Sequence, residues 1–286
     1  MKSAVIVMAY LGQPSGIAQL STYFAPIDAH LYVHIDAKVS AEPYGVLSTR
    51  PNITLIQVRQ EVFWGGFNTV RAVIGAIELA QSAADYGRFV VITEDSIPLV
   101  GSQAMANMLS SETEWIEVNP IDQDWVVQRY RNFYCFDSYA TNPRHLDPSE
   151  RFFNGAFLRK LERMNALMVE GKTPLAKLFV GSSWWALSAA AIQVVLTRHR
   201  EDKRLRESFE FSAIPEEHYF QTILAQANWD RPRLPLMYTD FDRDPKPYLF
   251  KNAADVRIVQ AVHQHPFLRK IDIQSVETRE FVESLA

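Results

Sequence analysis

The sequence contains a single cysteine, Cys135, among 286 residues, so a disulfide within the chain is impossible. This favours a reducing compartment and excludes folds that depend on disulfide bonds. The sequence also lacks the roughly eighteen consecutive apolar residues that a membrane-spanning helix needs. The apolar run at residues 4–9 is shorter than the core of a signal peptide. We therefore expect a cytoplasmic protein without an integral membrane segment.

Neither sign of charge dominates, since 29 Lys and Arg residues face 33 Asp and Glu residues, which gives a net charge of −4. Such a chain has no general attraction for nucleic acid or for anionic membranes, and we expect no nucleic-acid partner.

Two motifs are also missing. The segment 12–16 lacks the G-x-G-x-x-G pattern of dinucleotide-binding enzymes, and the chain lacks the G-x-S-x-G elbow of nucleophilic hydrolases.

Strand and helix patterns alternate over the first hundred residues. The strand patterns cover Ala4–Ala9, His30–Ile35, Ile53–Val58 and Phe89–Thr93, and the helical patterns cover Gly16–Phe24 and Thr69–Ala84. This alternation predicts an α/β fold with a mainly parallel central sheet flanked by helices. Ligands of such sheets bind beyond the carboxyl ends of the strands, where Asp36 and Glu94-Asp95 fall.

The rest of the chain is less regular but shows no repeat and no linker. A helix is predicted from Ser188 to about His199, and a short strand near Leu236–Thr239. We therefore expect one domain over residues 1–286. Its nucleotide-binding half would cover about residues 1–120, and its acceptor-binding and catalytic half about residues 121–286.

Two adjacent carboxylates, Glu216 and Glu217, follow Pro215 in a segment with helical periodicity. Proline suits the first turn of a helix because its missing N–H is not needed there. A carboxylate at that position, where a buried helix face meets the space beyond the helix end, is well placed to act as a general base. The alternative is that both glutamates only complement the helix dipole.

Four segments together resemble one family, the core-2/I-branching β-1,6-N-acetylglucosaminyltransferases and their xylosyltransferase relatives (glycosyltransferase family 14). They are Leu31–Lys38 with His-x-Asp, Glu61–Ala72 with Trp-Gly-Gly, Val91–Leu99, and Val180–Ser188 joined to Pro215–Leu224; a weaker match is Pro266–Lys270. The matches keep the family's order over nearly the whole chain. The lack of a membrane anchor and of the cysteines typical of animal members indicates a bacterial member.

The resemblance implies a GT-A-type nucleotide-sugar fold and an inverting transfer of N-acetylglucosamine from a UDP-sugar to a hydroxyl of a glycan. Glu217, rather than Glu216, aligns with the family's catalytic base. Asp36, Trp64 and Asp95 would lie at the UDP-sugar site.

Basic side chains near the C-terminus hold the diphosphate in this family without a required metal. Lys270 matches one of them, and Arg233 is the predicted partner. We therefore expect no cofactor and no divalent metal. Arg129, Arg131 and Trp185 are the candidates for the wall of the acceptor site.

Several alternatives stay open at this level. The donor sugar could be xylose or glucuronic acid, or the chain could be a catalytically silent scaffold that binds sugar nucleotides. Glu94-Asp95 could bind a divalent cation, because hard cations prefer clustered carboxylates. Asp240-x-Asp242-x-Asp244 has a similar composition but is more typical of a solvated turn. His263 and His265 lack further zinc ligands nearby in the sequence.

Overall fold

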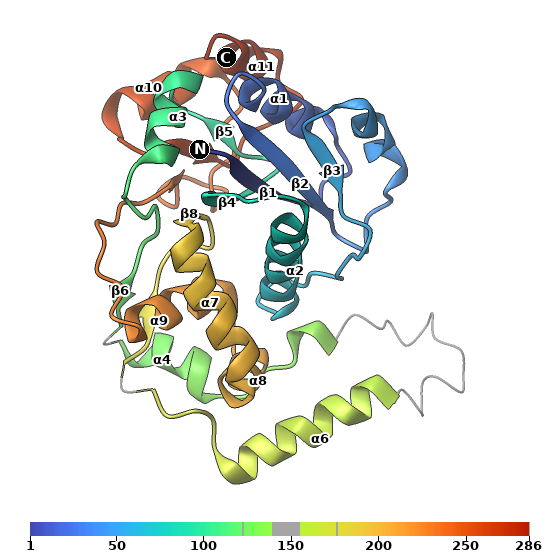
Figure 1. Cartoon of the computed structure of the whole chain (residues 1–286), viewed down its shortest axis with the longest axis vertical. Helices are drawn as coiled ribbons and strands as arrows, with labels where there is room; N and C mark the ends of the chain where they lie inside the picture. Colours follow the sequence, from blue (N-terminus) through green and yellow to red (C-terminus); the bar gives the residue numbers. More distant parts are fainter. Residues whose placement is uncertain (122, 139–154, 176, 286) are drawn as a thin grey trace.

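A five-stranded sheet forms the centre of the molecule (Figure 1), in the order β3-β2-β1-β4-β8. The computed structural model describes residues 1–121, 123–138, 155–175 and 177–285. The strands of the central sheet are β1 (Ser3–Ala9), β2 (Ala29–Ile35), β3 (Ile53–Leu55), β4 (Arg88–Thr93) and β8 (Trp185–Ser188). The first four are parallel, and β8 runs antiparallel to β4. The predicted α/β fold with a mainly parallel sheet is confirmed.

Helices cover both faces of this sheet. The α-helices are α1 (Ser15–Phe24), α2 (Asn68–Ala83), α3 (Ser102–Ser110), α4 (Asp124–Arg131), α6 (Gly155–Glu170), α7 (Ala189–Glu201), α8 (Lys203–Glu210), α9 (Tyr219–Gln226), α10 (Ala253–Val262) and α11 (Val276–Glu283). Short 3-10 helices are η1 (Glu42–Thr49), η2 (Phe136–Ser138) and η3 (Pro215–Glu217). Two small sheets pair β5 (Ile97–Pro98) and β9 (Met237–Thr239) with β10 (Phe267–Arg269), and β6 (Asn119–Pro120) with β7 (Phe179–Val180).

Strand β1 separates two hydrophobic cores, because successive side chains of a strand point to opposite faces. Ile6 and Met8 pack in the core that includes α2, α7 and α9. Val5 and Val7 pack in the core that includes α1, α10 and α11. All seven residues of β1 are buried, as expected of a parallel strand that is covered on both faces.

The segment that carries Glu216 and Glu217 is not the single helix that the sequence predicts. Ile214 adopts a left-handed conformation with φ 51°, and the hydrogen bond from His218 N to Pro215 O at 3.0 Å closes a 3-10 turn. His218, with φ −127°, interrupts the helix, and α9 begins only at Tyr219. The left-handed Ile214 turns the chain sharply into η3.

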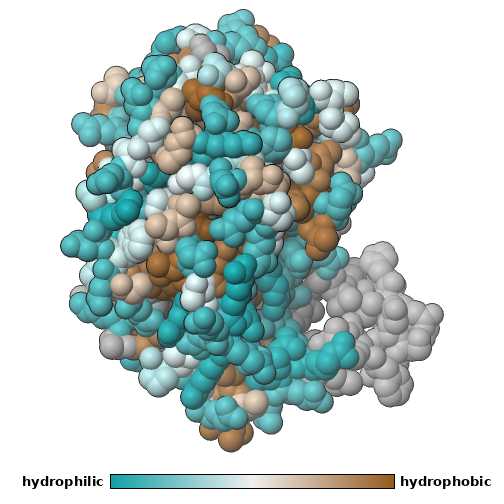
Figure 2. Space-filling model, viewed as in Figure 1, coloured by the Kyte–Doolittle hydropathy of each residue, from teal (hydrophilic) through white to brown (hydrophobic). Residues whose placement is uncertain are grey.

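The surface on the face shown in Figure 2 is largely hydrophilic, with smaller apolar areas between the polar residues. Within the described ranges, none of the helices combines the length and the apolar character that a membrane crossing requires.

A buried ion pair fixes the edge of the sheet where the two halves of the chain meet. Arg88, at the start of β4, contacts Glu114 at 3.2 Å, and their side chains are 1% and 0% exposed. Glu114 also accepts hydrogen bonds from the backbone N–H of Ser188 at 2.8 Å and from its hydroxyl at 2.5 Å. Burial of this kind is tolerated only because both charges are fully paired.

We expect Glu114→Gln to lower the free energy of unfolding by about 3–5 kcal/mol, because it leaves the charge of Arg88 buried without its counterion. Urea denaturation at neutral pH measures the loss. The control is Glu78→Gln, which removes an exposed partner of Arg200 and should cost at most about 1 kcal/mol. Equal losses in the two variants would show that burial does not set the strength of the Arg88–Glu114 pair.

Candidate active site

Polar side chains gather where β2, β1 and β4 end. Asp36 follows β2, Tyr10 follows β1, and Glu94 and Asp95 follow β4. The register pairs Ala9 of β1 with the last residue of β2, and Met8 with the last residue of β4. Asp36 and Asp95 therefore lie at the same edge of the sheet, separated by two strand spacings or about 10 Å.

Asp36 closes a turn at the end of β2. Its carboxylate accepts hydrogen bonds from Lys38 N at 2.9 Å and Val62 N at 3.3 Å, and it pairs with Lys38 Nζ at 2.5 Å. Two residues earlier, burial lowers the pKa of His34 to about 4, and its Nε2 accepts a hydrogen bond from Gln60 N at 2.9 Å. The His-x-Asp segment thus anchors the loop 59–67 against the strand end.

Glu94 is committed to holding the chain after β1. Its side chain is fully buried and accepts hydrogen bonds from the backbone N–H groups of Tyr10 and Leu11 and from the Tyr44 hydroxyl at 2.8 Å. Burial raises the pKa of the Glu94 carboxyl. These contacts favour a structural role for Glu94 over the alternative of a cation ligand.

Asp95 keeps a free oxygen in a buried position. Its Oδ2 accepts a hydrogen bond from the Tyr10 hydroxyl at 2.7 Å and lies 3.7 Å from Arg269. Its Oδ1 is buried and has no hydrogen-bond donor among the described residues. The guanidinium of Arg269 lies 5.0 Å from the ring centre of Trp184. Because buried polar atoms are nearly always paired, this oxygen is suited to accept a hydrogen bond from a ligand hydroxyl.

The C-terminal segment brings Lys270 next to this cluster. Ile271 N donates to the backbone O of Asp95 at 3.1 Å, and Phe250 N donates to Lys270 O at 2.8 Å. Lys270 forms no ion pair with any carboxylate in the described ranges. Arg243 reaches the same region, since its guanidinium lies 5.0 Å from the ring centre of Phe250.

Arg233, the predicted partner of Lys270, lies elsewhere. It is exposed and forms a β-bridge with Glu114, the partner of Arg88 at the amino end of β4. Lys270 lies near Asp95, beyond the carboxyl end of the same strand. The structure therefore does not bring Arg233 together with Lys270.

Glu217 ends the η3 turn with its carboxylate half-exposed. Its Oε2 accepts a hydrogen bond from Arg129 of α4 at 3.0 Å, and its backbone O accepts one from Gly181 N at 3.0 Å. Burial raises the pKa of the Glu217 carboxyl, while Arg129 acts in the opposite direction. A carboxylate that is oriented by an arginine and has a raised pKa is suited to accept a proton.

Arg129 and Glu217 are held in place by their backbones. Ala213 N donates to Arg129 O at 2.8 Å. The ammonium group of Lys172 donates to the carbonyls of Tyr130, Asn132 and Phe211 at 2.6–2.8 Å. These bonds fasten the end of α4 to the segment that leads into η3.

The Trp-Gly-Gly turn connects the two groups of side chains. Val62, before this turn, contacts Asp36, and Gly65 O accepts a hydrogen bond from Ile214 N at 3.0 Å. Gly65 has φ +80°, which strongly favours glycine, and a Cβ on Gly66 would lie 1.9 Å from Asp137 Oδ1. Trp64 itself is 77% exposed. The turn that carries this exposed indole therefore links the sheet edge to η3, and the indole itself lies 6.4 Å from the ring of Phe136.

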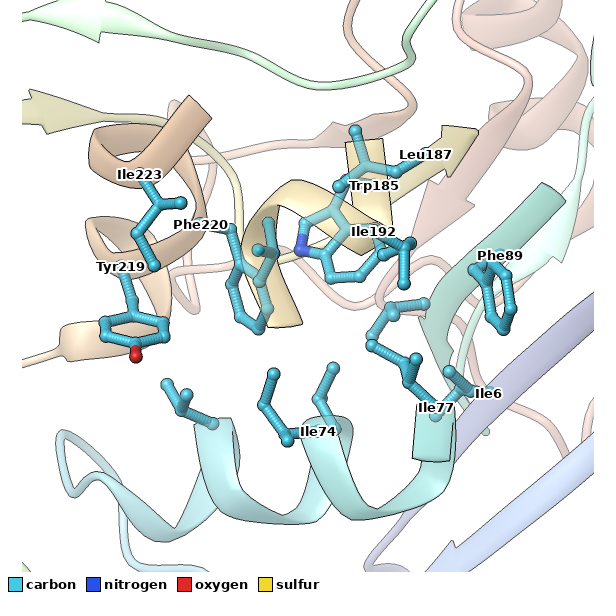
Figure 3. Packing of buried hydrophobic residues seen from close by; sticks show 14 of the residues in the cluster. Ile6, Ile74, Ile77, Phe89, Trp185, Leu187, Ile192, Tyr219, Phe220 and Ile223 are labelled. Atoms are coloured by element: carbon cyan, nitrogen blue, oxygen red, sulfur yellow. The ribbon is translucent and has the colours of Figure 1, made fainter. Parts of the chain in front are cut away.

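The three predicted acceptor residues have different positions. Arg129 contacts Glu217 directly, whereas Arg131, two residues further along α4, is exposed and lines a separate cavity with Phe133 and Lys177. Trp185 lies in the core: it is 0% exposed, and its ring lies 4.9 Å from that of Phe220. Figure 3 shows it among apolar side chains of α2, α7 and α9. This burial contradicts its assignment to the acceptor wall, and the neighbouring Trp184 is only partly buried and has its ring centre 5.0 Å from the guanidinium of Arg269.

Sequence reasoning missed three contributors to the site, Tyr10, Trp184 and the Arg269 side chain. Tyr10 follows the first strand and could have been inferred from the rule that ligands bind at carboxyl strand ends. The strand alternation allowed either Trp184 or Trp185 to face the site. No local signal indicated that Arg269 would reach Asp95.

The metal-like sequence Asp240-x-Asp242-x-Asp244 forms a turn. The Asp240 carboxylate accepts hydrogen bonds from Asp242 N at 2.9 Å and Arg243 N at 3.2 Å, and it pairs with the Arg243 side chain at 2.7 Å. Asp242 and Asp244 are exposed. The interpretation as a turn is confirmed, but the turn is solvated only at Asp242 and Asp244, because Asp240 is 5% exposed.

A comparison with family models matches residues 11–247 to the family described as Core-2/I-Branching enzyme. The matched range covers most of the chain and contains Asp36, Trp64, Asp95 and Glu217, whereas Lys270 lies beyond its end. No curated protein matches the chain.

We expect the Glu216 carboxyl to make stability depend on pH. Burial raises its pKa to about 8, from an ordinary value of 4.5. The folded state therefore keeps a proton that the unfolded chain releases, and this stabilisation is present below about pH 4.5 and is lost as the pH rises through about 8. Glu216→Gln does not titrate. The free energy of unfolding of Glu216→Gln, relative to that of the wild type, should therefore rise between pH 5 and pH 8.5. The expected rise is about 1.4 kcal/mol or more, because one pKa unit corresponds to that free energy.

Urea denaturation of both proteins at the two pH values measures this difference. Glu78→Gln, at an exposed position on α2, serves as the control and should show no such trend. A constant difference between Glu216→Gln and the wild type would mean that Glu216 is ionised in the folded protein at neutral pH.

Proposed function

The chain belongs to the Core-2/I-branching enzyme family, whose members are UDP-sugar-dependent glycosyltransferases, and we propose that it transfers N-acetylglucosamine with inversion to a hydroxyl of a glycan. The central sheet, mainly parallel and flanked by helices, is consistent with a GT-A-like fold. The donor and acceptor classes follow from the family: a nucleotide sugar and a glycan.

The environment of Glu217 is the observation that carries this proposal. Inversion in one step needs a base that takes the proton of the acceptor hydroxyl while the diphosphate leaves from the opposite face of the sugar. Glu217 offers a half-exposed carboxylate with a raised pKa, and Arg129 fixes one of its oxygens at 3.0 Å. The second oxygen is the one that we assign to the acceptor hydroxyl.

The donor would occupy the edge of the sheet between Asp36 and Asp95. Asp95 Oδ1 has no donor among the described residues and would accept a hydrogen bond from a hydroxyl of the UDP-sugar. Trp64, on the turn that connects Asp36 with η3, would cover the sugar close to the base.

Charge on the departing diphosphate has to be offset as the bond to the sugar breaks. Lys270 is suited to this task because it lies beside the Asp95 strand end and has no ion pair with a described carboxylate. Arg243, whose guanidinium lies 5.0 Å from the ring centre of Phe250, is a better placed partner for it than Arg233, although its Nε already pairs with Asp240. We propose that these side chains take the place of a divalent metal.

We expect Glu217→Gln to bind UDP like the wild type but to lower the rate of transfer by roughly 10²-fold or more, the usual contribution of a general base. The assay is transfer from UDP-N-acetylglucosamine, with UDP-xylose and UDP-glucuronic acid as competing donors and UDP binding measured by calorimetry. The matched control is Glu216→Gln, which should keep most of its activity. An active Glu217→Gln beside an inactive Glu216→Gln would reverse the assignment, and a wild type inactive with every donor would favour a silent scaffold.

We expect transfer to survive excess EDTA, because basic side chains rather than a divalent ion would offset the diphosphate charge. Initial rates with EDTA, with added Mn²⁺ and with neither are compared at constant ionic strength. Loss of activity in EDTA that Mn²⁺ restores would instead support a cation bound at Glu94-Asp95.

A further inference from the structure

Only two of the six tryptophans of the chain, all of which the structure describes, are exposed: Trp64 at 77% and Trp125 at 63%. Trp125 lies in the first turn of α4. The same helix buries Val126 and Tyr130, so its apolar face is already packed without the indole. Exposure of one aromatic ring is ordinary by itself, so the position of this ring relative to Glu217 decides what it can do.

The orientation of the Trp125 ring is fixed by two contacts. Its Nε1 donates a hydrogen bond to Gln123 Oε1 at 2.8 Å, and the guanidinium of Arg129 lies 5.0 Å from its ring centre. A ring that is held in this way loses little further freedom when a ligand binds against it, which favours affinity.

The ring also lies close to the proposed base. The guanidinium that contacts Trp125 is the group that donates to Glu217 Oε2 at 3.0 Å, so one arginine head separates the indole from the carboxylate. Trp64 approaches η3 from another element, through the hydrogen bond between Gly65 and Ile214. Both exposed tryptophans therefore lie next to the same turn.

We propose that Trp125 is a stacking platform for a pyranose ring of the acceptor glycan. This inference rests on the proposed function, because it assumes that Glu217 marks the position of the acceptor hydroxyl. An indole offers a broad apolar face to the C–H face of a sugar. The polar groups around it, Gln123 and the guanidinium of Arg129, offer hydrogen bonds to the sugar hydroxyls, as specific polar contacts do in ligand sites.

The first test separates acceptor binding from chemistry. Trp125→Ala should raise the acceptor KM about tenfold, equivalent to about 1.4 kcal/mol, with kcat within about twofold of the wild type and hydrolysis of the UDP-sugar unchanged. Trp125→Phe should recover most of the affinity. Ile258→Ala, which truncates an equally exposed side chain on α10, is the control and should change neither constant.

The competing role for Trp125 is to position Arg129. If the ring only positions Arg129, then Trp125→Ala should lower kcat, shift the acidic limb of the kcat–pH profile to higher pH, and leave the acceptor KM unchanged. That result would overturn the proposal, as would an unchanged KM together with an unchanged kcat.

A second measurement does not depend on activity. Methyl β-galactopyranoside and methyl N-acetyl-β-glucosaminide, which differ at C4 and so cover both orientations of that hydroxyl, are titrated into the wild type in the presence of UDP. The indole N–H resonance of Trp125, assigned with Trp125→Phe, should shift and saturate with at least one sugar. No shift of this resonance with either sugar would overturn the proposal. Inactivity of the wild type with every donor would count against the proposed function alone, because this titration would still report on Trp125.

Discussion

The hydrogen bond from Ile214 N to Gly65 O at 3.0 Å joins the two parts of the candidate site. On one side, the turn that contains Gly65 is tied to Asp36 at the end of β2 through Val62. On the other side, Ile214 leads directly into η3 and Glu217. The polar edge of the sheet and the turn that carries Glu217 therefore share one short segment. Ile214, the residue that makes this bond, adopts a left-handed conformation with φ 51°, which is strained for a residue other than glycine.

Charge is distributed differently in the two parts of the site. At the sheet edge, each carboxylate already has a partner: backbone N–H groups for Glu94, Lys38 for Asp36, and Tyr10 with Arg269 for Asp95. Such pairing keeps the charges stable when they are buried. At η3, Arg129 engages one oxygen of Glu217 and leaves the other open. Asp95 likewise keeps one oxygen without a donor among the described residues, so each part of the candidate site leaves one carboxylate oxygen open to a ligand.

Periodic elements were predicted well from the sequence, whereas contacts between distant segments were not. β1, β2, α1 and α2 follow from runs of apolar residues, because burial on a sheet or a helix face imposes a period. The assignment of Trp185 failed because strand alternation says that neighbouring side chains diverge but not which of them meets the core. The predicted pairing of Arg233 with Lys270 failed for a related reason. The position of Arg233 depends on a β-bridge to Glu114, more than a hundred residues away in the sequence.

Adjacent residues of one turn show how local surroundings can give the same side chain two roles. Glu216 and Glu217 are both glutamates in a three-residue 3-10 helix, where consecutive side chains point about a third of a turn apart. One oxygen of Glu216 is buried without a partner among the described residues, and its pKa rises to about 8. We therefore expect Glu216 to be largely protonated at neutral pH and to add little negative charge beside Glu217. A neutral neighbour spares Glu217 the repulsion of a second carboxylate, which helps it to stay ionised and able to accept a proton.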